Sequence, residues 1–90
     1  MEFEWHSDKA ARNLAKHGVS FQEAATVFGD PLAITYDDPH HSKDEDRFLT
    51  FGPSSTARLL VVSHSDRDDR TRIISAREAT PKERKQYEKC

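Results

Sequence analysis

The sequence predicts an α+β domain with the element order β-α-α-β-β-β-β-α. Two neighbouring helical patterns follow a short strand at the N-terminus, four strand-like segments come next, and a third helical pattern comes last. Four consecutive strands with short connections favour an antiparallel sheet, and we expect the helices to lie on one side of it. The chain has the length of one small domain, so residues 1–90 are expected to form a single domain.

The N-terminal part is predicted to hold a strand and a helical hairpin. In FEW, residues 3–5, aromatic residues alternate with an acidic one, as in a half-buried strand. Ser7 is the expected N-cap of a first helix that ends before Gly18, because glycine readily adopts the left-handed conformation that ends many helices. The second helix is predicted to begin with a capping box, in which the Glu23 side chain returns to the Ser20 amide.

The rest of the chain is predicted to form the sheet and a final helix. Strands are expected at residues 32–38, 47–52, 58–65 and 70–76. The segment RLLVVSHS is the most apolar of them and is the expected centre of the sheet. The last helix is predicted to begin at Thr80, because Thr80, Pro81 and Glu83 combine an N-cap, a proline at the first helical position and a second capping box.

The last two strands are expected to bring a histidine and two arginines together. If residues 65–69 form the loop between these strands, His64 lies opposite Arg70 and Val62 lies opposite Arg72. His64, Arg70 and Arg72 then share one face at one end of the sheet. This pairing depends on the register, since a slip of one residue would turn the side chains to the other face.

A cluster of this kind is suited to a phosphate group. Arginine offers a planar fork of donors to phosphate oxygens, and an imidazole can carry a proton near neutral pH. Cleavage of RNA without a metal needs a base, an acid and cations that stabilise the phosphorane. His64, Arg70, Arg72 and Arg77 can supply parts of this chemistry. In the alternative interpretation, Arg70 and Arg72 pair with acidic residues of the adjoining loop, which are Asp66, Asp68 and Asp69.

The charges are distributed unevenly along the chain. Residues 1–46 hold four Lys or Arg against ten Asp or Glu, whereas residues 47–90 hold ten against six. The formal net charge is −2, but the first half is therefore acidic and the second half is basic. Either the second half binds an anion, or the two halves neutralise each other in the fold.

Other features of the sequence argue against several function classes. His40 and His41 lie among acidic residues, but their spacing resembles no zinc site, so a solvated loop, no metal and no cofactor are expected. Cys90 is the only cysteine, which excludes an internal disulfide and favours the cytoplasm. No segment reaches the ~20 apolar residues of a membrane helix.

Three motifs carry a resemblance to a known family. The combination of KHGVSF, FGDP and RIISAR, within the longer segments FEWHSDKAARNLAKHGVSFQEAATVFGDP and RIISAREATPKERKQYE, resembles the BrnT toxins of bacterial type II toxin–antitoxin pairs. The resemblance covers nearly all of the chain. It implies a fold similar to RelE-type ribonucleases, cleavage of RNA that arrests translation, and neutralisation by a BrnA-type antitoxin with a ribbon-helix-helix part.

The resemblance also implies how the partners are arranged. The antitoxin would bind DNA, so that the complex represses its own operon and the toxin meets DNA only indirectly. A complex of two toxins and two antitoxins is expected. An alternative function is a non-catalytic module that uses the same basic face to bind RNA or an acidic protein.

The site residues are carried over position by position. Matches to the family motifs include Lys16 and His17 at the front, and Arg72, Arg77, Arg84 and Tyr87 at the back. The expected catalytic residues are His64, Arg72 and Arg77, and the expected RNA contacts are Lys16, Arg70, Arg84 and Tyr87. Where the family often has FEWD, this chain has His6. We expect this change to leave the helix start to Ser7 and Asp8.

Overall fold

A computed structural model describes residues 1–41 and 45–89, and its elements follow the predicted order. They are β1 (Glu2–Glu4), α1 (Ser7–His17), α2 (Phe21–Val27), β2 (Ile34–Asp37), β3 (Arg47–Pro53), β4 (Leu59–Arg67), β5 (Arg70–Glu78) and α3 (Pro81–Glu88), with a short 3-10 turn at Pro39–His41. The α+β fold class is therefore confirmed. The predicted acidic loop lies partly, and Cys90 wholly, outside the described residues.

The strands form one five-stranded sheet in the order β1-β5-β4-β3-β2. The strands β2 to β5 are antiparallel neighbours, as predicted, and β4, the most apolar strand, is at the centre. The first strand differs from the prediction because β1 pairs in parallel with β5. The sheet is therefore mixed, and its β1–β5 pairing joins two distant parts of the sequence.

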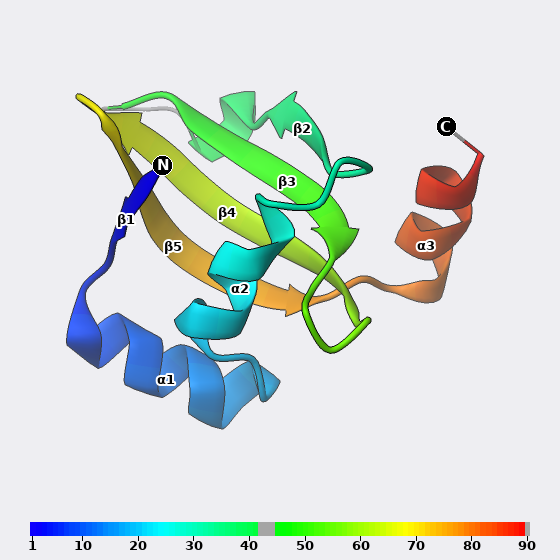
Figure 1. The fold of residues 1–90 in the computed structure, drawn as a ribbon, viewed down its shortest axis with the longest axis horizontal. Helices are drawn as coiled ribbons and strands as arrows, with labels where there is room; N and C mark the ends of the chain where they lie inside the picture. The colour runs from blue at the N-terminus through cyan, green and yellow to red at the C-terminus, as the bar shows by residue number, and fades with distance from the viewer. Residues whose placement is uncertain (42–44, 90) are drawn as a thin grey trace.

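Helices α1 and α2 lie together on one face of the sheet, and the core lies between them and the strands (Figure 1). The core residues come from α2 and the residue before its cap, from β4 and from β5. They are Val19, Phe21, Ala24, Val27, Leu60, Val62, Ile73 and Ala76. Aromatic rings at the margin extend this cluster, with Trp5 packed edge-on against Phe21 at 6.0 Å between ring centroids.

The helix ends confirm some of the predicted caps and correct others. Gly18 has φ 69° and ends α1, and Thr80 with Glu83 forms the complete capping box of α3. The N-cap of α1 was predicted one residue late. His6, not Ser7, holds the extended N-cap position, and the His6 side chain makes no capping hydrogen bond.

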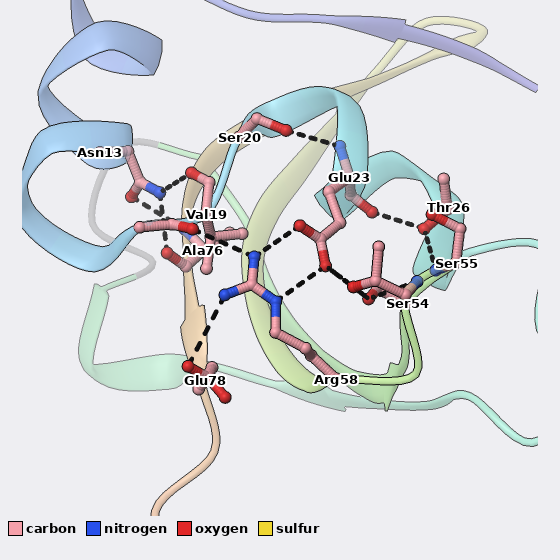
Figure 2. Close-up of polar contacts among 12 residues, drawn as sticks. Asn13, Val19, Ser20, Glu23, Thr26, Ser54, Ser55, Arg58, Ala76 and Glu78 are labelled. Carbon is pink, nitrogen blue, oxygen red and sulfur yellow. Dashed lines mark hydrogen bonds and ion pairs between the residues drawn. The ribbon is translucent and has the colours of Figure 1, made fainter.

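The predicted capping box of α2 forms only in part. The Ser20 hydroxyl accepts a hydrogen bond from the Glu23 amide at 3.0 Å, as expected. The Glu23 carboxylate does not return to Ser20 but accepts hydrogen bonds from Arg58 and from the hydroxyl groups of Ser54 and Thr56 (Figure 2). A stronger, charged donor thus replaces the expected amide, and the Glu23–Arg58 pair ties α2 to the β3–β4 turn.

The predicted register of the last hairpin is wrong. The two strands continue to Arg67 and Arg70, so the turn has only two residues, and His64 pairs with Ile73 instead of Arg70. A bulge between Ser63 and His64 shifts the pairing again. As a result Leu60 and Val62 share the core face with Ile73 and Ala76. The arginines lie on the other face.

The predicted placement of all helices on one side is also wrong. Helix α3 lies apart from α1 and α2, beyond the end of β5 (Figure 1). The Tyr87 hydroxyl donates a hydrogen bond to the Leu32 carbonyl at 2.8 Å. Residues Glu83, Gln86 and Tyr87 line an apolar groove together with Tyr36, Leu49 and Phe51, which lie on the sheet face opposite the core.

Candidate functional site

The open face of the sheet, which is the face turned away from α1 and α2, carries a group of arginines. Helix α3 lies against one end of this face. The other end carries four arginines, which we call the arginine cluster: Arg47, Arg67, Arg70 and Arg72. The register places them side by side, because Ser65 pairs with both Arg47 and Arg72, and Arg67 pairs with Arg70. Alternation along the strands turns all four to the same face.

Two glutamates of β1 border the arginine cluster. Arg70 Nη1 lies 3.5 Å from Glu4 Oε1, Arg70 Nε lies 4.0 Å from Glu2, and Arg67 Nη1 lies 4.0 Å from Glu4. These pairs are long and exposed, and such pairs contribute little to stability. The alternative in which Arg70 pairs with Asp66, Asp68 or Asp69 is therefore wrong, since its partners come from β1.

Arg72 has no ion pair and no hydrogen bond to its side chain within residues 1–41 and 45–89. Its half-buried side chain lines a pocket of about 310 Å³, which we call the Arg72 pocket, together with Glu4, Trp5, His6 and Arg67. The pocket thus brings two guanidinium groups beside one carboxylate, one imidazole and one indole. Cations and proton-transfer groups are the components that phosphodiester cleavage requires.

Three residues of the Arg72 pocket were not predicted from the sequence: Glu4, Trp5 and His6. They belong to β1 and to the start of α1, and only the parallel β1–β5 pairing brings them to Arg72. Glu4 lies directly opposite Arg72 in this pairing. The alternating FEW segment indicated a strand, but a strand pattern alone does not say which other strand it joins.

His64 lies on the core face and away from the arginine cluster. Its side chain is 5% exposed, and its Nε2 is 2.7 Å from the Thr50 hydroxyl. The ring packs against Phe28 at 4.8 Å and Phe48 at 5.7 Å between centroids. Burial lowers the pKa of His64, and the nearby Asp66 carboxylate only partly opposes this effect. The expected grouping of His64 with Arg70 and Arg72 depended on the register that the structure corrects.

Arg77 lies on the open face but at the end near α3. Its Nη1 and Nη2 donate hydrogen bonds to the two carboxylate oxygens of Glu83 at 2.7 and 2.9 Å. This two-point contact is the strongest geometry for an arginine–carboxylate pair. The Arg77 guanidinium lowers the pKa of Glu83 to about 2, and the pKa of Arg77 is raised in turn.

The remaining predicted contacts are dispersed over the molecule. Lys16 is exposed on α1, beside the edge of β5. Arg84 is exposed on α3, and Tyr87 packs α3 against the segment before β2. Of the predicted site residues, the structure therefore places Arg70 and Arg72 in the arginine cluster, whereas Arg77, Arg84 and Tyr87 lie at the α3 end.

Two further observations concern metals and membranes. Within the described part of the chain, no three His, Cys, Asp or Glu residues are arranged so that they could hold a metal ion. His41 instead contacts Asp38, with Nδ1 2.9 Å from a carboxylate oxygen. None of the helices among the described residues is long and apolar enough to cross a bilayer.

The fold and the arginine cluster define a small α+β protein with a half-covered sheet whose open end is suited to a polyanion. The chain belongs to the BrnT family of ribonuclease toxins of type II toxin–antitoxin systems, since the family model matches residues 5–83. The resemblance inferred from the three motifs is thereby confirmed.

A solved structure agrees with this assignment at the level of the fold. The chain is similar to the 1.1 Å crystal structure of the Brucella abortus ribonuclease toxin BrnT, with a TM-score of 0.70 and 22% sequence identity. The match covers 89% of this chain and 97% of that protein. No curated protein sequence matches the chain.

Proposed function

We propose that this protein is a metal-independent endoribonuclease toxin that inhibits translation in the cytoplasm, and that RNA is cleaved at the Arg72 pocket. The observation that carries the proposal is the guanidinium of Arg72, which has no ion-pair or hydrogen-bond partner among residues 1–41 and 45–89 and lies in one pocket with Arg67, a carboxylate and an imidazole. Membership of a ribonuclease toxin family supports the reaction class. The open face around the pocket supplies the positive charge that an RNA backbone requires.

The proposed reaction begins with a phosphodiester bound between Arg67 and Arg72. The Glu4 carboxylate accepts the proton of the 2′-hydroxyl, and the 2′-oxygen attacks the phosphorus. The bond from phosphorus to the 5′-oxygen breaks, and protonated His6 donates its proton to that oxygen. The products are a 2′,3′-cyclic phosphate and a 5′-hydroxyl, and the two guanidiniums stabilise the extra negative charge of the phosphorane.

Trp5 and Arg70 support the same site in different ways. Trp5 borders the Arg72 pocket, and aromatic side chains offer stacking surfaces to nucleotide bases. Arg70 extends the positive surface towards the β4–β5 turn. His64 and Arg77 are not part of this proposal, and Arg84 and Tyr87 stay predictions as RNA contacts at the end of the sheet near α3.

The proposal is tested with purified protein and RNA in the presence of a chelator. We expect the wild-type protein to cleave RNA, and Arg72→Ala to reduce the rate by about 10²–10³-fold, as for loss of one transition-state donor. Arg72→Lys should restore only part of the rate, because lysine lacks the planar fork. Lys85→Ala removes one exposed positive charge from α3 and serves as the control. Normal cleavage by Arg72→Ala would refute the site.

The same experiment separates cleavage from binding alone. A non-catalytic module would bind RNA with a salt-dependent affinity and leave it intact. Expression of the chain alone should stop growth, and Arg72→Ala should relieve the arrest. If the protein binds RNA but never cuts it, the function is that of a binding module.

We further propose that a BrnA-type antitoxin with a ribbon-helix-helix part neutralises the toxin by covering the open face. Its carboxylates would replace RNA phosphates at the arginine cluster, and the dimeric antitoxin would bring two toxins into one complex and contact DNA. Antitoxin and RNA should therefore compete for the toxin in a binding assay. Simultaneous binding of both would contradict this arrangement.

A further inference from the structure

We propose that a groove between α1 and β5 is a second phosphate-binding site, which holds the RNA backbone beyond the cleavage site. We call it the α1 groove. This inference rests on the proposed function and extends it from the scissile phosphate to a neighbouring stretch of single-stranded RNA.

The α1 groove has a volume of about 310 Å³ and gathers basic side chains from one face of a helix. Its lining residues are Lys9, Arg12, Asn13, Lys16, His17, Ile74 and Ser75. The five residues from α1 follow spacings of three and four, which place them on the same side of the helix. Four of these five are basic, so the groove is lined by positive charge on its helical side.

Among the described residues, no carboxylate forms an ion pair with the lysines and the arginine of the α1 groove. Lys9, Arg12 and Lys16 are exposed and have no ion pair within the described residues. The first 46 residues contain four Lys or Arg in total, so three of them meet in this one groove although that half of the chain is acidic.

Helix stability does not explain this arrangement. Lys16 and His17 lie in the last turn of α1, where positive charge is favourable, but Lys9 lies near the start, where it is unfavourable. Like charges three and four residues apart also destabilise a helix by about 0.2–0.5 kcal/mol per pair. A ligand with negative charge accounts for all the basic residues of the α1 groove, whereas a favourable interaction with the helix C-terminus accounts only for Lys16 and His17.

The α1 groove continues from the open face around the edge of β5. The pairing with β1 ends where Glu4 meets Arg72, so from that point to its end β5 pairs with β4 on one edge and has no neighbouring strand on the other. Ser75 lines the groove and also lies on the open face, opposite Ser63. A chain bound at Arg72 can therefore pass Ser75 and reach the basic face of α1 without crossing a covered surface.

The chemistry of the groove favours a nucleic-acid backbone over a protein partner. Among its lining residues only Ile74 is apolar, whereas the centre of a protein interface is usually apolar and poor in lysine. Lysine and arginine side chains on one helical face can contact successive phosphates of a flexible single strand. We therefore assign the groove to single-stranded RNA.

The test measures the salt dependence of RNA binding. A single-stranded 2′-O-methyl RNA of about a dozen nucleotides cannot be cleaved, because the attacking hydroxyl is blocked, and its affinity is followed from low to moderate salt. The slope of log K against log salt is negative, and we expect the triple variant Lys9→Gln/Arg12→Gln/Lys16→Gln to reduce its magnitude by about 2, at ~0.7 per lost phosphate contact. The variant Lys82→Gln/Lys85→Gln/Lys89→Gln, on α3 and at its C-cap, removes the same charge and should leave the slope near that of the wild type.

Cleavage assays separate this inference from the proposed function. The triple variant should raise the KM of a long RNA but cleave a dinucleotide at the wild-type rate, since a dinucleotide reaches only the Arg72 pocket. If Arg72→Ala cleaves RNA normally while the α1 triple variant still changes the salt slope of RNA binding, the Arg72 site is refuted and the α1 groove is supported. If both triple variants change the slope equally, or if the α1 variant weakens only antitoxin binding, the groove assignment is overturned. Circular dichroism confirms that each variant is folded.

Discussion

At the scale of single residues, the Asn13 side chain makes the hydrogen bonds that a neighbouring strand would make to the free edge of β5. Its side-chain amide donates to the carbonyls of Val19 and Ala76 at 2.9 and 2.8 Å, and its oxygen accepts from the Ala76 amide at 3.1 Å (Figure 2). Ala76 lies where β5 has passed the end of β1, so its backbone groups on that edge have no strand to pair with. Asn13 satisfies them and anchors α1 to the sheet.

Removal of this side chain should be costly. Asn13→Ala leaves buried backbone groups without partners, at about 1–3 kcal/mol for each unsatisfied group, and we expect a total loss of about 2–4 kcal/mol of unfolding free energy. Asn13→Asp keeps the shape but cannot donate to the two carbonyls, so it should be comparably harmful. Urea unfolding measures both effects. Gln22→Ala, at an exposed position of α2, is the control, and a cost below about 1 kcal/mol for Asn13→Ala would contradict the role.

His6 allows stability and activity to be separated at one position. Its side chain makes no cap for α1, although asparagine at such a position caps well. We expect His6→Asn to stabilise the protein by about 0.5–2 kcal/mol and to raise the Tm by several degrees, at ~4–8 °C per kcal/mol. The same change removes the proposed proton donor and should slow RNA cleavage. If His6→Asn is more stable but cleaves RNA slowly, misfolding is excluded as the cause of the slow cleavage. Full activity of His6→Asn would show that His6 is not the proton donor.

At the scale of elements, the Arg77–Glu83 pair is a joint between β5 and α3. Glu83 also completes the capping box of α3, so one carboxylate serves both the helix start and the ion pair. This accounts for Arg77 by structure alone. The interpretation of Arg77 as a catalytic residue predicts a different pattern of mutant effects.

The two interpretations of Arg77 are distinguished by comparing variants of Arg77 and of its partner Glu83. If the pair is structural, Arg77→Ala and Glu83→Gln should destabilise the protein similarly, the double variant should cost little more, and RNA cleavage at low temperature should be unaffected by either. If Arg77 acts on RNA, only Arg77→Ala should slow cleavage. Urea unfolding and cleavage rates of the three variants, compared with Lys85→Ala, make the distinction.

Which elements form was predictable from the sequence, but how the last hairpin pairs was not. Capping residues and apolar patterns located every helix and strand, because these signals are local. The turn at Asp68 and Asp69 lacks the usual glycine, and Asp68 takes φ 55° in its place, so the loop was predicted too long. The bulge near His64 leaves no local signal either, and together they moved His64 from the arginine face to the core.

The site was predictable only in part for the same reason. Arg70 and Arg72 were recognised as a pair because they alternate on one strand. Glu4 and His6 were not, since their position depends on a parallel pairing between the two ends of the chain. Arg77 was assigned to the site because nothing in its own segment indicates that Glu83 binds it.

At the scale of the whole molecule, the two halves of the chain neutralise each other only in part. Arg58 pairs with Glu23, and Arg67 and Arg70 lie beside the glutamates of β1, so basic residues of the second half meet carboxylates of the first. Arg72 and the basic face of α1 are left without such partners in the described part of the chain. The expected neutralisation of the two halves is therefore confirmed in part, and the binding of an anion by the second half stays a prediction.

The carboxylates that do pair make the molecule sensitive to acid. Arg58 is the main reason that the pKa of Glu23 falls to about 2, and Arg77 lowers the pKa of Glu83 to about 2. Both values lie below the ordinary value of 4.5, so the folded state binds these protons less tightly than the unfolded chain. Their contribution to stability is complete above about pH 5 and is lost as the pH falls towards 2.

Glu23→Gln should reveal one of these two contributions. Glutamine keeps the size of the side chain but loses the charge–charge contact with Arg58, so the variant should be less stable at pH 7 by about 1–3 kcal/mol, at ~1.4 kcal/mol per pKa unit and with allowance for solvent screening. The difference from the wild type should shrink steadily between pH 5 and pH 3. As the pH falls, the wild-type carboxylate is protonated first in the unfolded chain and, at lower pH, in the folded protein as well. Urea unfolding at a series of pH values measures this, with Glu88→Gln as the exposed control. A difference that stays constant from pH 7 to pH 3 would show that the Glu23 charge does not stabilise the contact between α2 and the β3–β4 turn.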